Sequence, residues 1–147
     1  MTPDELRTRP TARHAILYDG HCRFCTAGAR KLALLMRRGS VELVDFQQPG
    51  ALDRFPGISY EACMERMYLV TPDGRVFGGA EAIAQALATL PGVGRLALLY
   101  YVPGIRQLLD RLYRLIAANR YRIMGRAVAA GECADGTCAL HLKQRKA

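Results

Sequence analysis

Two cysteines spaced three residues apart stand where an apolar stretch of the chain gives way to a basic, amphipathic one. Cys22 and Cys25 form this C-x-x-C pair, and the apolar residues Ile16 to Tyr18 before it are typical of a strand. The residues after it repeat their apolar side chains at helical spacing, so the pair is expected at the start of a helix. Unpaired backbone N–H groups and the positive end of the helix dipole stabilise a thiolate there. Because the thiolate is the form of cysteine that attacks disulfides, this position indicates redox chemistry.

The helical pattern gives the two sulfurs different roles. Cys25 is expected to point inward because it shares one apolar face with Gly28, Ala29, Leu32, Leu35 and Met36. Cys22, one turn earlier, is expected to be the accessible sulfur and the attacking nucleophile, with Cys25 as the resolving thiol. Asp19 precedes Cys22 by three residues, and we expect it to cap the helix or its entry turn. A proton relay between Asp19 and Cys25 is the alternative role for this carboxylate.

Length and composition favour a single globular domain. The chain has 147 residues, of which 50% are hydrophobic, which is enough for an adequate core. Residues 1–13 are polar and contain Pro3 and Pro10, so they are expected to form a disordered leader, not an apolar targeting segment. A cytoplasmic location is therefore predicted. An odd count of five cysteines then argues against a structural disulfide framework and for a catalytic or metal-binding pair.

The positive charge of the chain lies in its last third. Residues 92–147 hold ten Lys and Arg against three Asp and Glu, whereas residues 1–91 hold eleven against ten. Basic segments can meet nucleic acid or anionic lipid, but no nucleic-acid-binding motif accompanies this one. We therefore expect a solvated, arginine-rich helix face and no nucleic-acid partner.

Strands and helices are expected to alternate over the first 91 residues. Strands at 14–18 and 41–46 flank a helix over 23–38, which gives a parallel β-α-β unit. A short helix follows, which Ser59 could cap and in which Cys63 is expected to be a packed thiol. The remaining elements are a hairpin of 67–70 and 75–77 around the turn 71–74, and a helix from about 80 to 90. This order, with C-x-x-C opening the first helix, is the arrangement of a thioredoxin-like β-α-β-β-β-α core over residues 14–91.

A basic amphipathic extension is expected to follow over residues 92–130, with a cysteine-containing flexible tail over 131–147. Its apolar residues recur at helical spacing, at Ile105, Leu108, Leu109, Leu112, Leu115, Ile116, Asn119 and Ile123, with Asn119 as the one polar interruption. Such a stripe usually packs on its own domain, and docking to a membrane surface or a partner helix is the secondary possibility. The apolar run from Leu96 to Val102 is far shorter than the roughly 20 residues that a membrane span needs.

Three blocks of the sequence resemble the DCC family of thiol-disulfide oxidoreductases. In the first block, Asp19, Cys22 and Cys25 match the Asp-x-x-Cys-x-x-Cys signature of that family. The other two blocks are the stretch from Met67 through Phe77 to Ala82, and the residues Asn119 to Arg122 with Gly125, Arg126 and Cys133. The resemblance implies a thioredoxin-like fold and dithiol–disulfide exchange. The expected substrate is a protein or small molecule that carries a disulfide or a thiol, and no cofactor is expected.

Two other classes of function compete with redox chemistry. Cys133 and Cys138 form a C-x4-C pair followed by His141, and two cysteine pairs could bind zinc tetrahedrally. However, structural zinc sites usually bring their ligands from closely spaced knuckles, and more than 100 residues separate these two pairs. No metal is therefore expected. The third class is a non-catalytic interaction module that uses its basic helices, and the position of C-x-x-C at a helix start argues against it.

Overall fold

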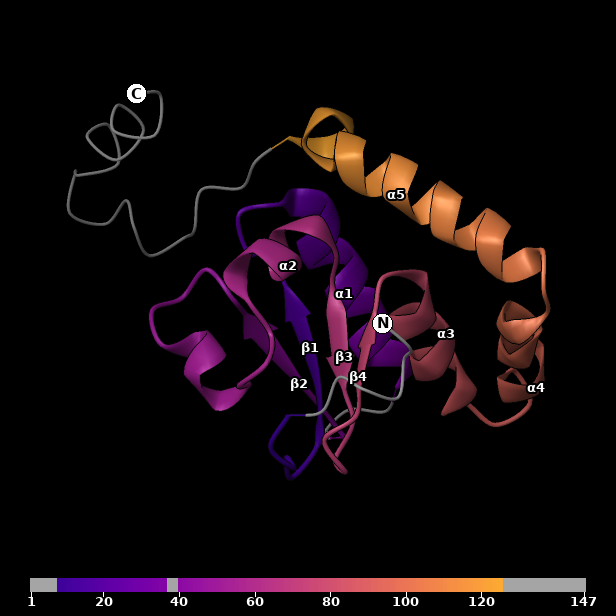
Figure 1. The fold of residues 1–147 in the computed structure, drawn as a ribbon, viewed down its shortest axis with the longest axis horizontal. Helices are drawn as coiled ribbons and strands as arrows, with labels where there is room; N and C mark the ends of the chain where they lie inside the picture. Colours follow the sequence, from indigo (N-terminus) through magenta and orange to yellow (C-terminus); the bar gives the residue numbers. More distant parts are fainter. Residues whose placement is uncertain (1–7, 37–39, 126–147) are drawn as a thin grey trace.

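A four-stranded mixed sheet forms the centre of the computed structural model, which describes residues 8–36 and 40–125 (Figure 1). The strands are β1 (His14–Tyr18), β2 (Val41–Asp45), β3 (Tyr68–Val70) and β4 (Val76–Gly78). Their order in the sheet is β2-β1-β3-β4. β1 and β2 are parallel and are joined by α1 (Arg23–Leu35), whereas β1 pairs with β3, and β3 with β4, in antiparallel fashion. The predicted β-α-β unit and hairpin are both present.

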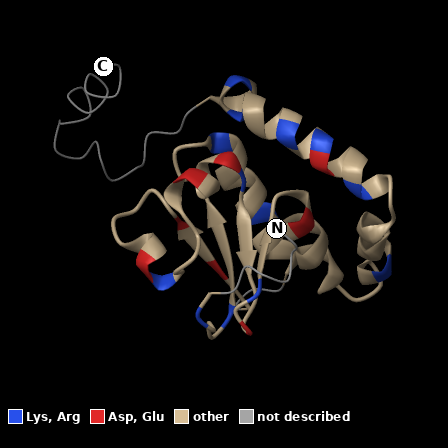
Figure 2. Cartoon of the chain, viewed as in Figure 1, with Lys and Arg blue, Asp and Glu red and all other residues tan. Residues whose placement is uncertain are grey.

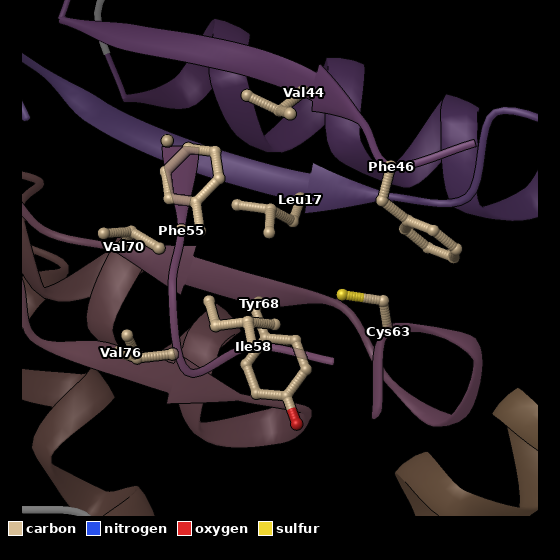
Figure 3. Close-up of a cluster of buried hydrophobic side chains, with 10 residues drawn as sticks. Leu17, Val44, Phe46, Phe55, Ile58, Cys63, Tyr68, Val70 and Val76 are labelled. Carbon is tan, nitrogen blue, oxygen red and sulfur yellow. The ribbon is translucent and has the colours of Figure 1, made fainter. Parts of the chain in front are cut away.

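The two faces of the sheet are covered by different parts of the chain. Alternate residues of a strand point to opposite faces, so Ile16 points toward the helices α1 and α3 (Ala80–Ala88), while Leu17 points to the other face. That second face is covered by η1 (Ala51–Arg54), α2 (Tyr60–Glu65) and the loops around them. Figure 3 shows the cluster they form, which contains Leu17, Val44, Phe46, Phe55, Ile58, Cys63, Tyr68, Val70 and Val76.

Cys63 is a core thiol, as the sequence predicted. It is 1% exposed within this cluster, and burial raises its pKa to about 12. The predicted helix cap is also present, because the Ser59 hydroxyl accepts a hydrogen bond from the Ala62 N–H at 3.1 Å. The architecture as a whole is a thioredoxin-like α/β fold, which confirms the predicted fold class.

The last described elements form an outer layer of helices beside α1 and α3. They are α4 (Gly94–Ala97), η2 (Leu98–Tyr101) and α5 (Ile105–Met124), and α5 contacts α1, α3 and η2 (Figure 1). The extension was expected to pack on the core through its apolar stripe. α5 does contact α1 and α3, but much of the stripe stays outside the contact: Leu108 is 66% exposed and Leu115 is 63% exposed. The helix packs through a different face, which includes Tyr113 and Arg120, because these side chains form hydrogen bonds with the core.

The N-terminal leader is another point of difference. Residues 8–13 were predicted to be part of a disordered segment, but Thr8 and Thr11 donate backbone hydrogen bonds to the carbonyls of Gly74 and Pro72. Gly74 has a φ of +83°, and a side chain there would overlap the Thr8 carbonyl, so glycine suits both the turn and the approaching chain. Residues 1–7 and the predicted tail with Cys133 and Cys138 lie outside the described residues.

Candidate active site

The C-x-x-C pair lies at the start of α1, and Cys22 is the N-cap residue itself. Its backbone is extended, and its Sγ accepts a hydrogen bond from the Cys25 N–H at 3.1 Å. A sulfur therefore occupies the place that a serine or aspartate oxygen usually takes at a helix start. The Cys22 sulfur thus has a backbone N–H donor directed at it at the start of the helix.

The turn that leads into α1 is tied to the end of β2. The Asp45 carboxylate accepts hydrogen bonds from the backbone N–H groups of Gly20 and Gln47, both at 2.9 Å. A Cβ on Gly20 would overlap this carboxylate. The glycine before His21 and Cys22 leaves room for the Asp45 carboxylate, which links the turn before α1 to the end of β2.

Asp19 is fully enclosed, with 1% of its surface exposed. Its Oδ1 accepts hydrogen bonds from the His21 N–H at 2.9 Å and from Gln47 Nε2 at 3.0 Å. Asp19 thus caps the entry turn, which is one of the two positions expected for it, while Cys22 caps the helix. Its other oxygen, Oδ2, faces α5.

Arg120 reaches this site from α5, 95 residues after Cys25. Its Nη2 lies 3.5 Å from Asp19 Oδ2, and its Nη1 lies 3.9 Å from Cys25 Sγ. Nη2 also donates a hydrogen bond to the Met64 carbonyl at 2.6 Å, and the residue is only 5% exposed. The guanidinium therefore bridges the buried carboxylate and the second thiol of the pair.

Two tyrosines of α5 support this arrangement. The Tyr121 hydroxyl donates a hydrogen bond to Asp19 Oδ2, and the Arg120 guanidinium lies 4.9 Å from the centroid of the Tyr121 ring. Burial, followed by the contact with Asp19, raises the pKa of Tyr121 to about 12. The Tyr113 hydroxyl accepts a hydrogen bond from the Met67 N–H at 2.9 Å, directly before β3. The helix is thus anchored at two points along its length.

The helical pattern of the sequence did not identify Arg120 and Tyr121 as site residues. It placed Arg120 outside the apolar stripe and gave it no role in the site. The available signal was the resemblance, because Asn119 to Arg122 formed one of its three blocks. Nothing in the local sequence indicates that this block faces Asp19.

The expected difference in accessibility between the two sulfurs is wrong. Cys22 is 0% exposed, whereas Cys25 is half-buried. The expected apolar face is also narrower than the pattern suggested: Ala29 and Leu32 are buried, but Leu35 is 53% exposed. The helix start is enclosed by parts of the chain distant in sequence, and helical periodicity carries no information about them.

The environment of Cys25 raises the pKa of this thiol and so favours its protonated form. The pKa of Cys25 is raised to about 12, first by burial and then by the hydrogen bond and negative charge of Cys22, while Arg120 acts in the opposite direction. Cys25 is therefore almost wholly protonated at neutral pH.

We expect Cys25 to react slowly with iodoacetamide at neutral pH, with a rate that rises about tenfold per pH unit up to a pH near 12. The measurement is alkylation of the reduced protein, followed by peptide mass spectrometry at each pH. Cys63 is the internal control, because its pKa is raised to about 12 as well and its side chain is buried. Alkylation of Cys25 at the rate of a free thiol at neutral pH would contradict this expectation.

The zinc alternative depends on side chains that the structure describes only in part. Within residues 8–36 and 40–125, no three His, Cys, Asp or Glu side chains gather as metal ligands would. Cys133, Cys138 and His141, which that alternative needs, lie outside these ranges.

Comparison with known families agrees with this geometry. The family model described as DCC1-like thiol-disulfide oxidoreductase matches residues 16–126. The chain belongs to the DCC1-like thiol-disulfide oxidoreductase family. The matched region runs from β1 to the end of α5, so it contains both the C-x-x-C pair and Arg120. Membership in the DCC1-like family supports a thiol–disulfide redox function and substrates that carry thiols. No curated protein and no solved structure matches the chain significantly.

Proposed function

We propose that this DCC1-like protein is an enzyme that catalyses thiol–disulfide exchange, with Cys22 as the nucleophile and Cys25 as the resolving thiol. The observation that carries the assignment is the hydrogen bond from the Cys25 N–H to Cys22 Sγ at the start of α1. It directs a backbone donor at the sulfur assigned as the nucleophile, while burial and the neighbouring sulfur keep Cys25 protonated. The substrate class is a protein or small molecule with an accessible disulfide or thiol, and the proposed location is the cytoplasm.

The reaction in the reducing direction has two steps. The Cys22 thiolate attacks one sulfur of a substrate disulfide, which forms a mixed disulfide through Cys22 and releases the other substrate sulfur as a thiolate. Cys25 then loses its proton to that released thiolate or to solvent and attacks Cys22 Sγ. This second step forms the Cys22–Cys25 disulfide and releases the remaining substrate thiolate. The substrate gains two electrons, the cysteine pair loses two, and the reverse sequence oxidises a dithiol.

The surroundings of Cys25 favour this order of events. Before the first step, the hydrogen bond and negative charge of Cys22 both raise the pKa of Cys25. Once Cys22 is bound in a mixed disulfide, its sulfur no longer carries that charge. The positive charge of Arg120, 3.9 Å from Cys25 Sγ, remains and favours the Cys25 thiolate. Cys25 is thus activated after the substrate has been captured.

The burial of Cys22 adds a step before the attack. Because Cys22 is 0% exposed, a substrate sulfur can reach it only after local opening of the site. We propose that opening and exchange together determine the observed rate. Asp19 acts as a positioning residue in this scheme. It accepts a hydrogen bond from the entry turn and pairs with Arg120, and it does not contact the reacting sulfurs.

A redox titration tests this function directly. In buffers of varied glutathione ratio, the full chain should interconvert between a dithiol and a Cys22–Cys25 disulfide as one two-electron couple. Peptide mapping identifies the bond, and Cys133→Ser with Cys138→Ser removes any contribution from the second pair. Cys63→Ala is the matched control and should leave the couple unchanged. Failure to form the Cys22–Cys25 bond at every glutathione ratio would refute the proposal.

A further inference from the structure

The outer helical layer exposes much of the large apolar surface in the described part of the chain. The side chains concerned are Val93, Leu96, Leu98, Leu99, Tyr101, Val102, Ile105, Leu108, Leu109, Leu112, Leu115, Ile123 and Met124. Soluble proteins scatter single apolar residues over their surface, but a contiguous run marks an interaction site. The outer helical layer is therefore a candidate interaction surface.

The exposed residues of α5 form an ordered row. Leu108, Leu112, Leu115 and Ile123 follow one another at helical spacing, and we call these four residues the outer stripe. They are between 50% and 66% exposed. The stripe is free because the helix packs on the core through Tyr113 and Arg120, which lie on a different face.

Positive charge borders the outer stripe. Arg111 and Arg122 are exposed and stand at helical spacing beside Leu115, four residues before it and seven after it. Asp110 is the single acidic residue between positions 92 and 125, and it pairs with Arg106 and the Tyr100 hydroxyl away from the stripe. Figure 2 shows the resulting run of basic residues along α5. A partner must therefore offer negative charge beside an apolar surface.

The geometry points to the surface of an anionic lipid bilayer as that partner. An amphipathic helix with arginines at the edge of its apolar face lies in the plane of the bilayer, with its apolar side chains among the acyl chains and its cations at the headgroups. α5 has 20 residues, and at a rise of about 1.5 Å per residue the stripe from Leu108 to Ile123 is about 22 Å long. No helix in the described ranges has the length and apolar character to cross a membrane.

A second copy of this chain fits the same surface less well. A symmetric contact between two outer stripes would place the arginines of one copy near those of the other, and like charges at an interface are unfavourable. The bilayer meets both the apolar and the electrostatic requirement. Lipid contact through the outer stripe also leaves the packed face of α5 undisturbed, where Arg120 forms an ion pair with Asp19.

Vesicle binding by the full chain tests this inference. The probes are large vesicles of phosphatidylcholine alone and vesicles with about a quarter phosphatidylglycerol, at low salt and at about 0.5 M salt. We expect co-sedimentation with the anionic vesicles at low salt and much weaker binding to the neutral ones. Removing a cation near an anionic surface costs about fivefold in affinity, so Arg111→Gln with Arg122→Gln should weaken binding about 25-fold.

The apolar requirement is tested by Leu112→Ser with Leu115→Ser, which should weaken binding at least about tenfold. These side chains are exposed, so the melting temperature should stay close to that of the wild type. Leu34→Ser with Arg30→Gln is the matched control on α1, because both residues are exposed, and it should bind like the wild type.

Three results would overturn the inference. The first is no binding to anionic vesicles, and the second is equal binding by the wild type and the outer-stripe variants, which would assign the binding to another part of the chain. The third is a concentration-dependent dimer in sedimentation velocity that Leu112→Ser with Leu115→Ser dissociates, because the occupant would then be a second copy.

Discussion

Replacing Arg120 with methionine is expected to lower the free energy of unfolding by about 3–5 kcal/mol at neutral pH. The guanidinium is the cation that faces the buried Asp19 carboxylate, with side-chain exposures of 6% and 0%. Without the guanidinium, the Asp19 carboxylate stays buried with hydrogen-bond donors but no cation. Removing one partner of a buried ion pair is strongly destabilising. The anchor of α5 on the Met64 carbonyl is lost as well. Chemical denaturation of the reduced protein provides the measurement.

Arg106→Met is the matched control on the same helix. Arg106 has 41% of its side chain exposed and lies 4.0 Å from Glu81 and 3.9 Å from Asp110, so its loss should cost less than about 1 kcal/mol. Asp19→Asn combined with Arg120→Met should cost less than the sum of the two single changes, because the double variant leaves no unpaired charge. A cost for Arg120→Met as small as that for Arg106→Met would show that the pair does not hold α5 on the core.

The individual strands, the helices and the helix caps could be predicted because their causes are local. A short apolar run specifies β1, and the Ser59 cap and the turn that ends at Gly74 are local hydrogen-bonding patterns. Cys22 could be placed at the start of α1 for the same reason. Each of these features depends on residues that are within a few positions of one another.

The accessibility of the cysteines and the packing of α5 could not be predicted in this way. Both depend on contacts between residues far apart in sequence, above all the 95-residue separation between Cys25 and Arg120. A periodicity argument assigns the apolar face of a helix to the core, but here the packed face carries Tyr113, which accepts a hydrogen bond from the core, and Arg120, which donates one. Burial of polar groups is favourable when their partners are present, and single-helix patterns do not reveal those partners.

Cys25→Ser should accumulate a mixed disulfide through Cys22 when it is treated with oxidised glutathione, while Cys22→Ser should trap at least about tenfold less. In the first variant the attacking sulfur keeps the hydrogen bond from the backbone N–H of position 25, which the substitution does not remove. In the second variant the remaining thiol has a pKa raised by burial and is almost wholly protonated at neutral pH. Intact-mass spectrometry measures the glutathione adduct, and peptide mapping locates it. The variant with both cysteines replaced by serine is the control for adducts on other thiols.

This experiment separates two physical effects that oppose each other at the pair. The raised pKa of Cys25 disfavours its thiolate, whereas access favours Cys25, because it is half-buried and Cys22 is 0% exposed. The raised pKa of Cys25 persists in the folded protein, whereas the burial of Cys22 can be relieved by local opening, so ionisation should determine which sulfur is trapped. If the adduct instead formed on Cys25 in Cys22→Ser and not on Cys22 in Cys25→Ser, access would outweigh ionisation and the two roles would be reversed.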